Sequence, residues 1–465
     1  MAGAHEDAKF TQGNLMRHVS VMSFTASIGL MAIFAVDFVD MIFISMLGNA
    51  ALAAAVGYAG TLLFFTSSIS IGMSIAAGAL VARSIGAGQS QDGREYATSV
   101  LMIGALLSAI VVALIFAYMR PILSMLGASG ETLELAVSYL SIILPTMPIL
   151  MAAMVCGAVL RAHGDAKRAT MATLFGGIAN AVFDPLLIFG LGWGLEGAAV
   201  ASVIARITIL IVSIRPVLQI YDGLAPPRMD MLARDLKAVF GIAAPAVLAN
   251  VATPVGSAVV TREMAKFGTD AVAAMAIIGR LMPVAFAVIF ALSGAIGPIV
   301  GQNFGAGLRD RVRGAFLDGL KFVAIYVVVV AAILFLLRSY VADIFEAEGL
   351  TRSLVYLFCG PLALAGIFNG WIFVGNATFN NLGHPIYSTW INWGRNTIGM
   401  WPPVILGSAW FGASGVLIGQ AVGGVVFAMI SVWLALRIMD KEGGEDAARH
   451  FRPHLREHVV ANRRH

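Results

Sequence analysis

The chain has 465 residues, of which 59% are hydrophobic and only 12% are charged, about half of the ~25% that is usual in soluble domains. With a mean hydropathy of +0.86 it lacks the polar surface of a water-soluble protein, which excludes a soluble globular enzyme, a disordered chain and a nucleic-acid-binding domain. The net charge of +4 therefore has to be interpreted from where the charges lie, and the composition predicts a polytopic membrane protein.

Twelve apolar segments are long enough to cross a bilayer, whose hydrocarbon core of about 30 Å takes roughly 20 helical residues. Their length and continuous apolarity favour helices over barrel strands, which would alternate in segments of about 10 residues. The first segment is too long for a signal-peptide core, so we expect it to be retained as a helix. The predicted spans are 19–46, 58–82, 97–118, 134–160, 168–190, 195–216, 238–262, 271–297, 315–337, 354–378, 386–407 and 412–437.

The Lys and Arg residues favour one orientation. With the N-terminus inside, the inner segments hold 21 Lys and Arg residues and the outer loops hold 5. Since positive residues are retained on the cytoplasmic side, both termini are expected there, in a multi-pass protein of the inner (plasma) membrane. The basic pI of about 9.1 then reflects topology and not a nucleic-acid footprint. The two cysteines, Cys156 and Cys359, lie in apolar runs and show neither disulfide nor metal spacing.

An internal repeat has an offset of about 219 residues. The stretch Arg83-Ser-Ile-Gly86-Ala87-Gly88 reappears as Gln302-Asn-Phe-Gly305-Ala306-Gly307, and Gly48, Gly164 and Gly197 recur as Gly268, Gly383 and Gly415. Because six spans separate the copies, both copies of each match face the same side of the membrane, so the repeats are parallel. The sequence therefore predicts an all-α polytopic membrane protein, with twelve transmembrane helices in two six-helix lobes.

We divide the chain accordingly. A cytoplasmic segment (1–18) precedes the N-lobe (19–216), and a cytoplasmic linker (217–237) with chain-breaking Asp-Gly and Pro-Pro pairs leads to the C-lobe (238–437). The basic tail (438–465) is expected to contact anionic lipid. In the last span, Gly415, Gly419 and Gly423 recur every four residues, which predicts close approach of a neighbouring helix.

Three aspartates lie within predicted spans of the N-lobe. An aspartate at a helix centre costs roughly 2.5–3.5 kcal/mol, so such a residue is expected to be functional. Asp37 and Asp40 are three residues apart and share a helical face, as do Asn180 and Asp184, four apart. Pro185 frees a backbone carbonyl one turn before it. Together these oxygens would suit a proton, a sodium ion or a cationic substrate.

Several motifs resemble the multidrug and toxic compound extrusion (MATE) family over nearly all of residues 15–437. They are the duplicated Gly-Ala-Gly, the Leu-Gly stretch after the first helix, Leu160-Arg161-Ala162-His163-Gly164-Asp165, and Asn180 with Asp184-Pro185-Leu-Leu-Ile-Phe-Gly-Leu-Gly. The resemblance implies two lobes around a V-shaped cleft and cation- or drug-coupled export by alternating access. It also implies that Asp40, Asn180 and Asp184 form the N-lobe polar cluster of the DinF-type branch, with Tyr139 as a fourth member.

Two departures from the DinF-type pattern stand in the first helix. It lacks the proline about which some members bend, and Asp37 is an extra acid one turn before the family position. Which of Asp37 and Asp40 is primary stays open. The sodium-coupled NorM-type branch fits less well, because it implies an acid in the tenth helix, where this chain offers Asn369 and Asn376.

The C-lobe offers three further candidates for substrate binding. Glu263 either contacts a cationic substrate or pairs with its basic neighbours at the outer end of the seventh span. Arg280 and Arg395 lie within spans, where they either fix helix packing through carbonyl groups or hold an anionic substrate or a lipid phosphate.

The leading hypothesis is a secondary exporter, not an enzyme, that exchanges amphipathic, cationic organic compounds for protons, with sodium at Asp40, Asn180 and Asp184 as the alternative. No cofactor beyond the coupling ion and no metal is expected, and we expect a monomer. An intramembrane aspartyl protease would leave the duplication unexplained and lacks the Gly-x-Gly-Asp context at Asp184. A channel would need a ring of acids rather than acids in one lobe. A flippase of a lipid-linked substrate, with Arg280 and Arg395 on the phosphate, is the alternative that stays open.

Overall fold

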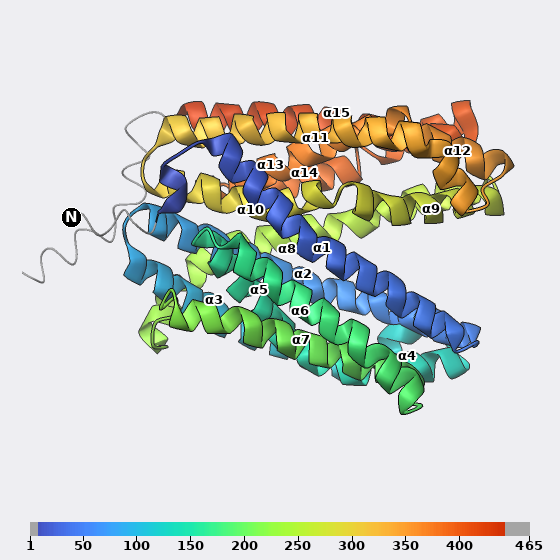
Figure 1. Cartoon of the computed structure of the whole chain (residues 1–465), viewed down its shortest axis with the longest axis horizontal. Helices are drawn as coiled ribbons and strands as arrows, with labels where there is room; N and C mark the ends of the chain where they lie inside the picture. Colours follow the sequence, from blue (N-terminus) through green and yellow to red (C-terminus); the bar gives the residue numbers. More distant parts are fainter. Residues whose placement is uncertain (1–7, 442–465) are drawn as a thin grey trace, which may run out of the picture.

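The computed structural model describes residues 8–441, and all regular elements in that part of the chain are helices (Figure 1). The α-helices are α1 (Leu15–Met46), α2 (Ala50–Gly86), α3 (Ser90–Met125), α4 (Gly130–Ile143), α5 (Met147–Ala162), α6 (Ala166–Pro185), α7 (Gly194–Gln219), α8 (Met229–Ala265), α9 (Thr269–Ala285), α10 (Ala287–Gly305), α11 (Arg309–Ile344), α12 (Gly349–Cys359), α13 (Gly366–Leu382), α14 (Ile386–Asn396) and α15 (Trp401–Lys441). Short helical turns are η1 (Lys9–Thr11), η2 (Leu144–Thr146), η3 (Leu186–Gly190) and η4 (Pro361–Ala365).

The number of crossings agrees with the sequence. Eleven helical stretches within residues 8–441 are long and apolar enough to cross a membrane. The last of them, Ile386–Lys441, reverses its direction at Gly412, where the backbone φ of 62° favours glycine. This stretch therefore supplies two antiparallel arms, one on each side of Gly412. The twelve transmembrane helices are thereby confirmed.

The two arms on either side of Gly412 pack backbone to backbone. A Cβ atom on any of the three repeated glycines of the second arm would overlap the backbone of the first arm. The predicted close approach is thus confirmed, and its partners are Gly407 for Gly415, Pro403 for Gly419 and Gly399 for Gly423.

Several helices extend beyond the predicted spans or divide them, and two of these differences have a visible cause. The span 271–297 consists of α9 and α10, which are separated at Phe286, and it continues to Gly305. Pro283 removes a helical hydrogen bond just before this break. Helix α8 begins at Met229, before the predicted start of the span at 238. The charged residues of its first turns interrupt the continuous apolar run from which the span was predicted.

The repeat is visible in the helices themselves. The N-lobe comprises α1–α7 and the C-lobe α8–α15, and α9, α11 and α12 begin 219 residues after α2, α3 and α4. Helix α1 crosses between the lobes (Figure 1). Near its start Phe24 contacts the ring of Phe322 on α11, and near its end Asp40 accepts hydrogen bonds from Asn180 on α6. The first helix therefore couples the two lobes.

The two copies of the Gly-Ala-Gly motif meet at one end of the molecule. A Cβ atom on Gly86 would overlap the backbone of Gln302, and one on Gly305 would overlap the backbone of Arg83. We call this the inner end, since the predicted orientation places it in the cytoplasm. The ribbons of the two lobes lie close together there and diverge toward the other end (Figure 1).

Residues 8–13, the N-terminal hook, fasten the inner end. Gln302 accepts a hydrogen bond from the Phe10 backbone N–H at 2.8 Å and donates to the carbonyl oxygen of Ala162 at 2.7 Å. Lys9 donates to Gly164 in the N-lobe at 3.1 Å, and Arg311 of α11 donates to Phe10 at 3.0 Å. Phe10 is only 1% exposed. The hook thus joins α5, α10 and α11.

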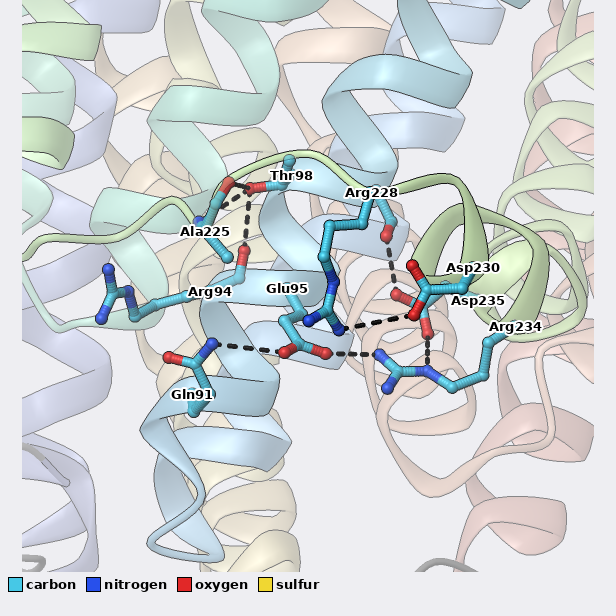
Figure 2. A network of polar contacts seen from close by, with 10 residues as sticks. Gln91, Arg94, Glu95, Thr98, Ala225, Arg228, Asp230, Arg234 and Asp235 are labelled. Carbon is cyan, nitrogen blue, oxygen red and sulfur yellow. Dashed lines mark hydrogen bonds and ion pairs between the residues drawn. The ribbon is translucent and has the colours of Figure 1, made fainter.

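A polar network adds a second connection at the inner end (Figure 2). Arg234 on α8 bonds Glu95 on α3 at 2.7 Å and Asp235 at 2.8 Å, and Ser99 donates to Asp235 at 2.6 Å. The linker takes part, because the Ala225 backbone N–H donates to the Thr98 hydroxyl at 2.9 Å. The structure is thus a conformation in which the lobes are closed at their inner ends.

Candidate functional site

The structure brings together three of the predicted site residues from α1 and α6. The amide of Asn180 donates to both carboxyl oxygens of Asp40, at 3.0 and 3.1 Å, and to one oxygen of Asp184, at 2.6 Å. Asn180 and Asp184 lie four residues apart, so one face of α6 presents both. One amide thus holds two carboxyl groups inside the N-lobe.

This cluster lies where α6 loses its regular geometry. Asp184 is fully buried, and its second oxygen, Oδ1, has no hydrogen-bond partner among the described residues. Pro185 follows directly, and η3 continues the chain as a π-helical turn, a geometry that is frequent at functional sites.

Asp37 and Tyr139 stand apart from these contacts. The side chain of Asp37 is exposed, and no described residue forms a hydrogen bond with it. Tyr139 on α4 is half-buried, and its hydroxyl donates to none of the three acids. The cluster therefore comprises Asp40, Asn180 and Asp184.

The three C-lobe candidates do not form one site. Glu263 lies at the end of α8 and forms an ion pair with Lys266 at 2.6 Å. The Arg280 guanidinium lies 5.6 Å from the centre of the Phe38 ring on α1. Arg395 on α14 donates to the side-chain oxygen of Asn369 on α13. Within residues 8–441 there is no group of three or more His, Cys, Asp or Glu that could hold a metal ion.

Sequence reasoning missed the contacts that fasten the inner end. In the sequence Gln302 stands out only through the repeat and nothing marks Arg311, although both bind the N-terminal hook. The available signal was a glutamine at the end of an apolar run, because such an amide needs partners if it is buried, as Gln302 is. The hook itself has no apolar period that could have revealed it.

Comparisons with known proteins agree with this architecture. The MatE family model matches residues 26–186 and 245–404. The chain is 31% identical over 435 residues to a FAD transporter of Shewanella oneidensis, covering 90% of this chain and 94% of the relative. It is 23% identical over 381 residues to the multidrug export protein MepA of Staphylococcus aureus, covering 79% and 81%.

Solved structures show the same fold. The bent form of the Vibrio cholerae MATE transporter VcmN superposes with a TM-score of 0.86 at 23% identity, over 92% of this chain and 98% of that one. An outward-facing multidrug resistance MATE family transporter gives 0.85 at 21% identity, over 94% and 99%. Family match, relatives and fold agree with the duplicated twelve-helix architecture, and the chain belongs to the MatE family of membrane transporters.

Proposed function

We propose that this transporter is a secondary exporter of amphipathic organic compounds and that protons drive it through Asp40, Asn180 and Asp184. The observation that carries the proposal is a pair of carboxyl groups on one amide, of which Asp184 is fully buried and its Oδ1 has no partner among the described residues. The relative named a multidrug export protein supports the substrate class.

The cluster has the properties that proton coupling needs. A carboxyl group away from water is costly when charged, so it exchanges a proton as its access to either side of the membrane changes. Protonation of Asp40 and Asp184 alternates with substrate binding in this scheme. One proton that moves down about 150 mV carries roughly 3.5 kcal/mol, enough for a roughly 300-fold gradient of a neutral solute.

The test is ethidium efflux from proteoliposomes with a pH gradient or a sodium gradient imposed separately. We expect the pH gradient alone to drive efflux, and Asp40→Asn and Asp184→Asn each to abolish it. Asp343→Asn is the control, because Asp343 pairs with Arg352 in the C-lobe, far along the chain from the cluster. Efflux driven by sodium alone, or retained in both cluster variants, would refute proton coupling at this site.

A second substrate class is favoured by the 31% identical relative named a FAD transporter. Arg395 also lacks a carboxylate partner among the described residues, as expected if a transported compound supplies the negative charge. The expected result is export of flavin adenine dinucleotide under the same gradient that drives ethidium. A flippase of a lipid-linked substrate would use the same arginine, so lipid scrambling in the same vesicles is the matching assay.

A further inference from the structure

Two long stretches of the C-lobe contain no acids. Between Leu350 and Met439 the sequence contains no Asp or Glu, and none occurs between Ala271 and Arg309. Arg395 lies within the first of these stretches, on α14. A guanidinium on α14 therefore has no acid from α10, α12, α13 or α14 to pair with; the described acids of the C-lobe lie on α8, α9 and α11, in the connection from α11 to α12 and at the end of α15.

The contacts of Arg395 leave its charge unbalanced. Its Nη2 donates to the neutral side-chain oxygen of Asn369, and its Nε is buried without a hydrogen-bond partner. No ion pair to Arg395 exists within residues 8–441. Asn369 Oδ1 lies 4.0 Å from where a Cβ of Gly424 would be, so the pair sits where α13, α14 and α15 meet.

Other arginines within spans have different surroundings. Arg206 in the N-lobe donates to the Ile143 carbonyl at 3.1 Å and to the Thr146 hydroxyl at 2.8 Å. Arg280 is exposed and lies over the ring of Phe38. A structural role therefore accounts for Arg206, whereas Arg395 keeps donors that its neighbours leave unused.

Those unused donors suit a particular ligand. A buried charge is costly unless a counter-charge accompanies it. A guanidinium matches phosphate and carboxylate oxygens with two parallel hydrogen bonds, and these charge-assisted bonds are about twice as strong as neutral ones. The amide of Asn369 also carries two N–H donors beside its oxygen, so it can turn to donate to the same anion.

We infer that Arg395 and Asn369 form an anion subsite in the C-lobe, which binds the phosphate or carboxylate group of an organic substrate. This inference rests on the proposed function, in which the protein transports organic compounds. The two lobes then have different roles. The carboxyl groups of the N-lobe exchange the coupling ion, and the guanidinium of the C-lobe selects the substrate.

The test compares two ligands that differ by one phosphate, flavin mononucleotide and riboflavin. Binding to the purified full-length protein is followed by quenching of flavin fluorescence. The wild type is expected to bind flavin mononucleotide about tenfold more tightly or better, as one or two charge-assisted bonds predict. Arg395→Gln is expected to remove that preference and leave riboflavin binding unchanged, while Arg395→Lys keeps part of it.

The control is Arg338→Gln, which changes a C-lobe arginine that lies over the rings of Phe335 and Tyr356. It is expected to keep the full preference. If Arg395→Gln does not fold, Asn369→Leu tests the same subsite and should weaken the preference several-fold. A preference that survives in Arg395→Gln, or that is absent from the wild type, would overturn the subsite.

Two additions separate this inference from the proposed function and from a lipid ligand. If the wild type exports ethidium under a pH gradient but shows no preference for flavin mononucleotide, the exporter stands and the subsite does not. If the wild type moves no compound yet prefers flavin mononucleotide, the subsite stands and the proposed function does not. Displacement of flavin mononucleotide by short-chain phosphatidylglycerol would assign the subsite to a lipid phosphate, and its absence to a soluble one.

Discussion

Asp37 and Asp40 lie one helical turn apart, but their contacts differ. Both aspartates lie on α1, but only Asp40 reaches the amide of Asn180, while Asp37 is exposed and bonds to no described residue. The helical period predicts that the two share a face. Which of them meets α6 depends on how α1 is rotated against that helix, and this rotation is set by packing, which the sequence pattern does not contain.

This geometry predicts different outcomes for the same substitution at the two positions. Asp40→Asn is expected to reduce proton-driven ethidium efflux at least about tenfold, since removing one partner of a buried charged network costs more than about 1.4 kcal/mol. Asp37→Asn is expected to keep most of the wild-type rate. Initial efflux rates at matched protein density in the vesicles provide the measurement. Equal losses in both variants would place Asp37 in the coupling cluster as well.

The duplicated Gly-Ala-Gly motif is explained by a contact between its two copies. The sequence shows that the motif recurs, and the structure shows that the two copies touch, with the backbone of α2 against that of α10. A repeat of this kind reveals equivalent positions but not that they are in contact. Likewise the break at Phe286 separates α9 from α10, whereas the equivalent stretch of the N-lobe is the single helix α2, so the repeat alone could not predict the break.

Two glycines of α2 allow a matched test of this contact. In Gly86→Ala the new methyl group would overlap the backbone of Gln302, whereas at Gly57 no atom lies within 4 Å of the new position. We expect Gly86→Ala to lower the melting temperature in detergent and to impair transport, as overpacking against backbone costs about 1–3 kcal/mol. Gly57→Ala should change stability by less than about 1 kcal/mol. Identical melting temperatures for the two variants would contradict the contact.

The contacts of the N-terminal hook lead to a further prediction. Gln302→Leu removes the hydrogen bonds to Phe10 and to Ala162, so the inner end should open more often. Buried Cys156 belongs to a core cluster shared by α2, α5 and α8, and its labelling by a membrane-permeant maleimide should become several-fold faster. Buried Cys359 lies in the C-lobe core and serves as the internal control. Equal acceleration at both cysteines would indicate general loosening instead of opening at the hook.

Charge is distributed unequally over the two similar lobes. The repeat that relates them does not extend to their buried charges, since Asp40 and Asp184 lie in the N-lobe and Arg395 in the C-lobe. The duplicated twelve-helix fold follows from hydropathy and from the glycine spacing, so it could be predicted. The docking of the lobes depends on polar contacts between residues far apart in the sequence, such as Glu95 with Arg234, and no local pattern reveals those.

The polar network of Figure 2 predicts that this docking is cooperative. Arg234 binds Glu95 across the lobes and is itself held by Asp235, which is 2% exposed. In a double-mutant cycle, Glu95→Gln and Arg234→Gln should therefore be non-additive by about 1 kcal/mol, because either change alone breaks the same contact. Melting temperatures of the two single variants and the double variant in detergent provide the measurement.

The matched control is the ion pair of Arg313 with Asp440, which joins α11 to α15 within one lobe and leaves both side chains about half exposed. Its cycle should give a coupling near zero, as is typical of exposed pairs. High salt should weaken the exposed pair first, since solvent screens it, while the Glu95–Arg234 pair, anchored to a buried carboxylate, should keep most of its coupling. If both cycles give the same coupling energy, the network is ordinary surface pairing, and the hook and the glycine contact alone close the inner end.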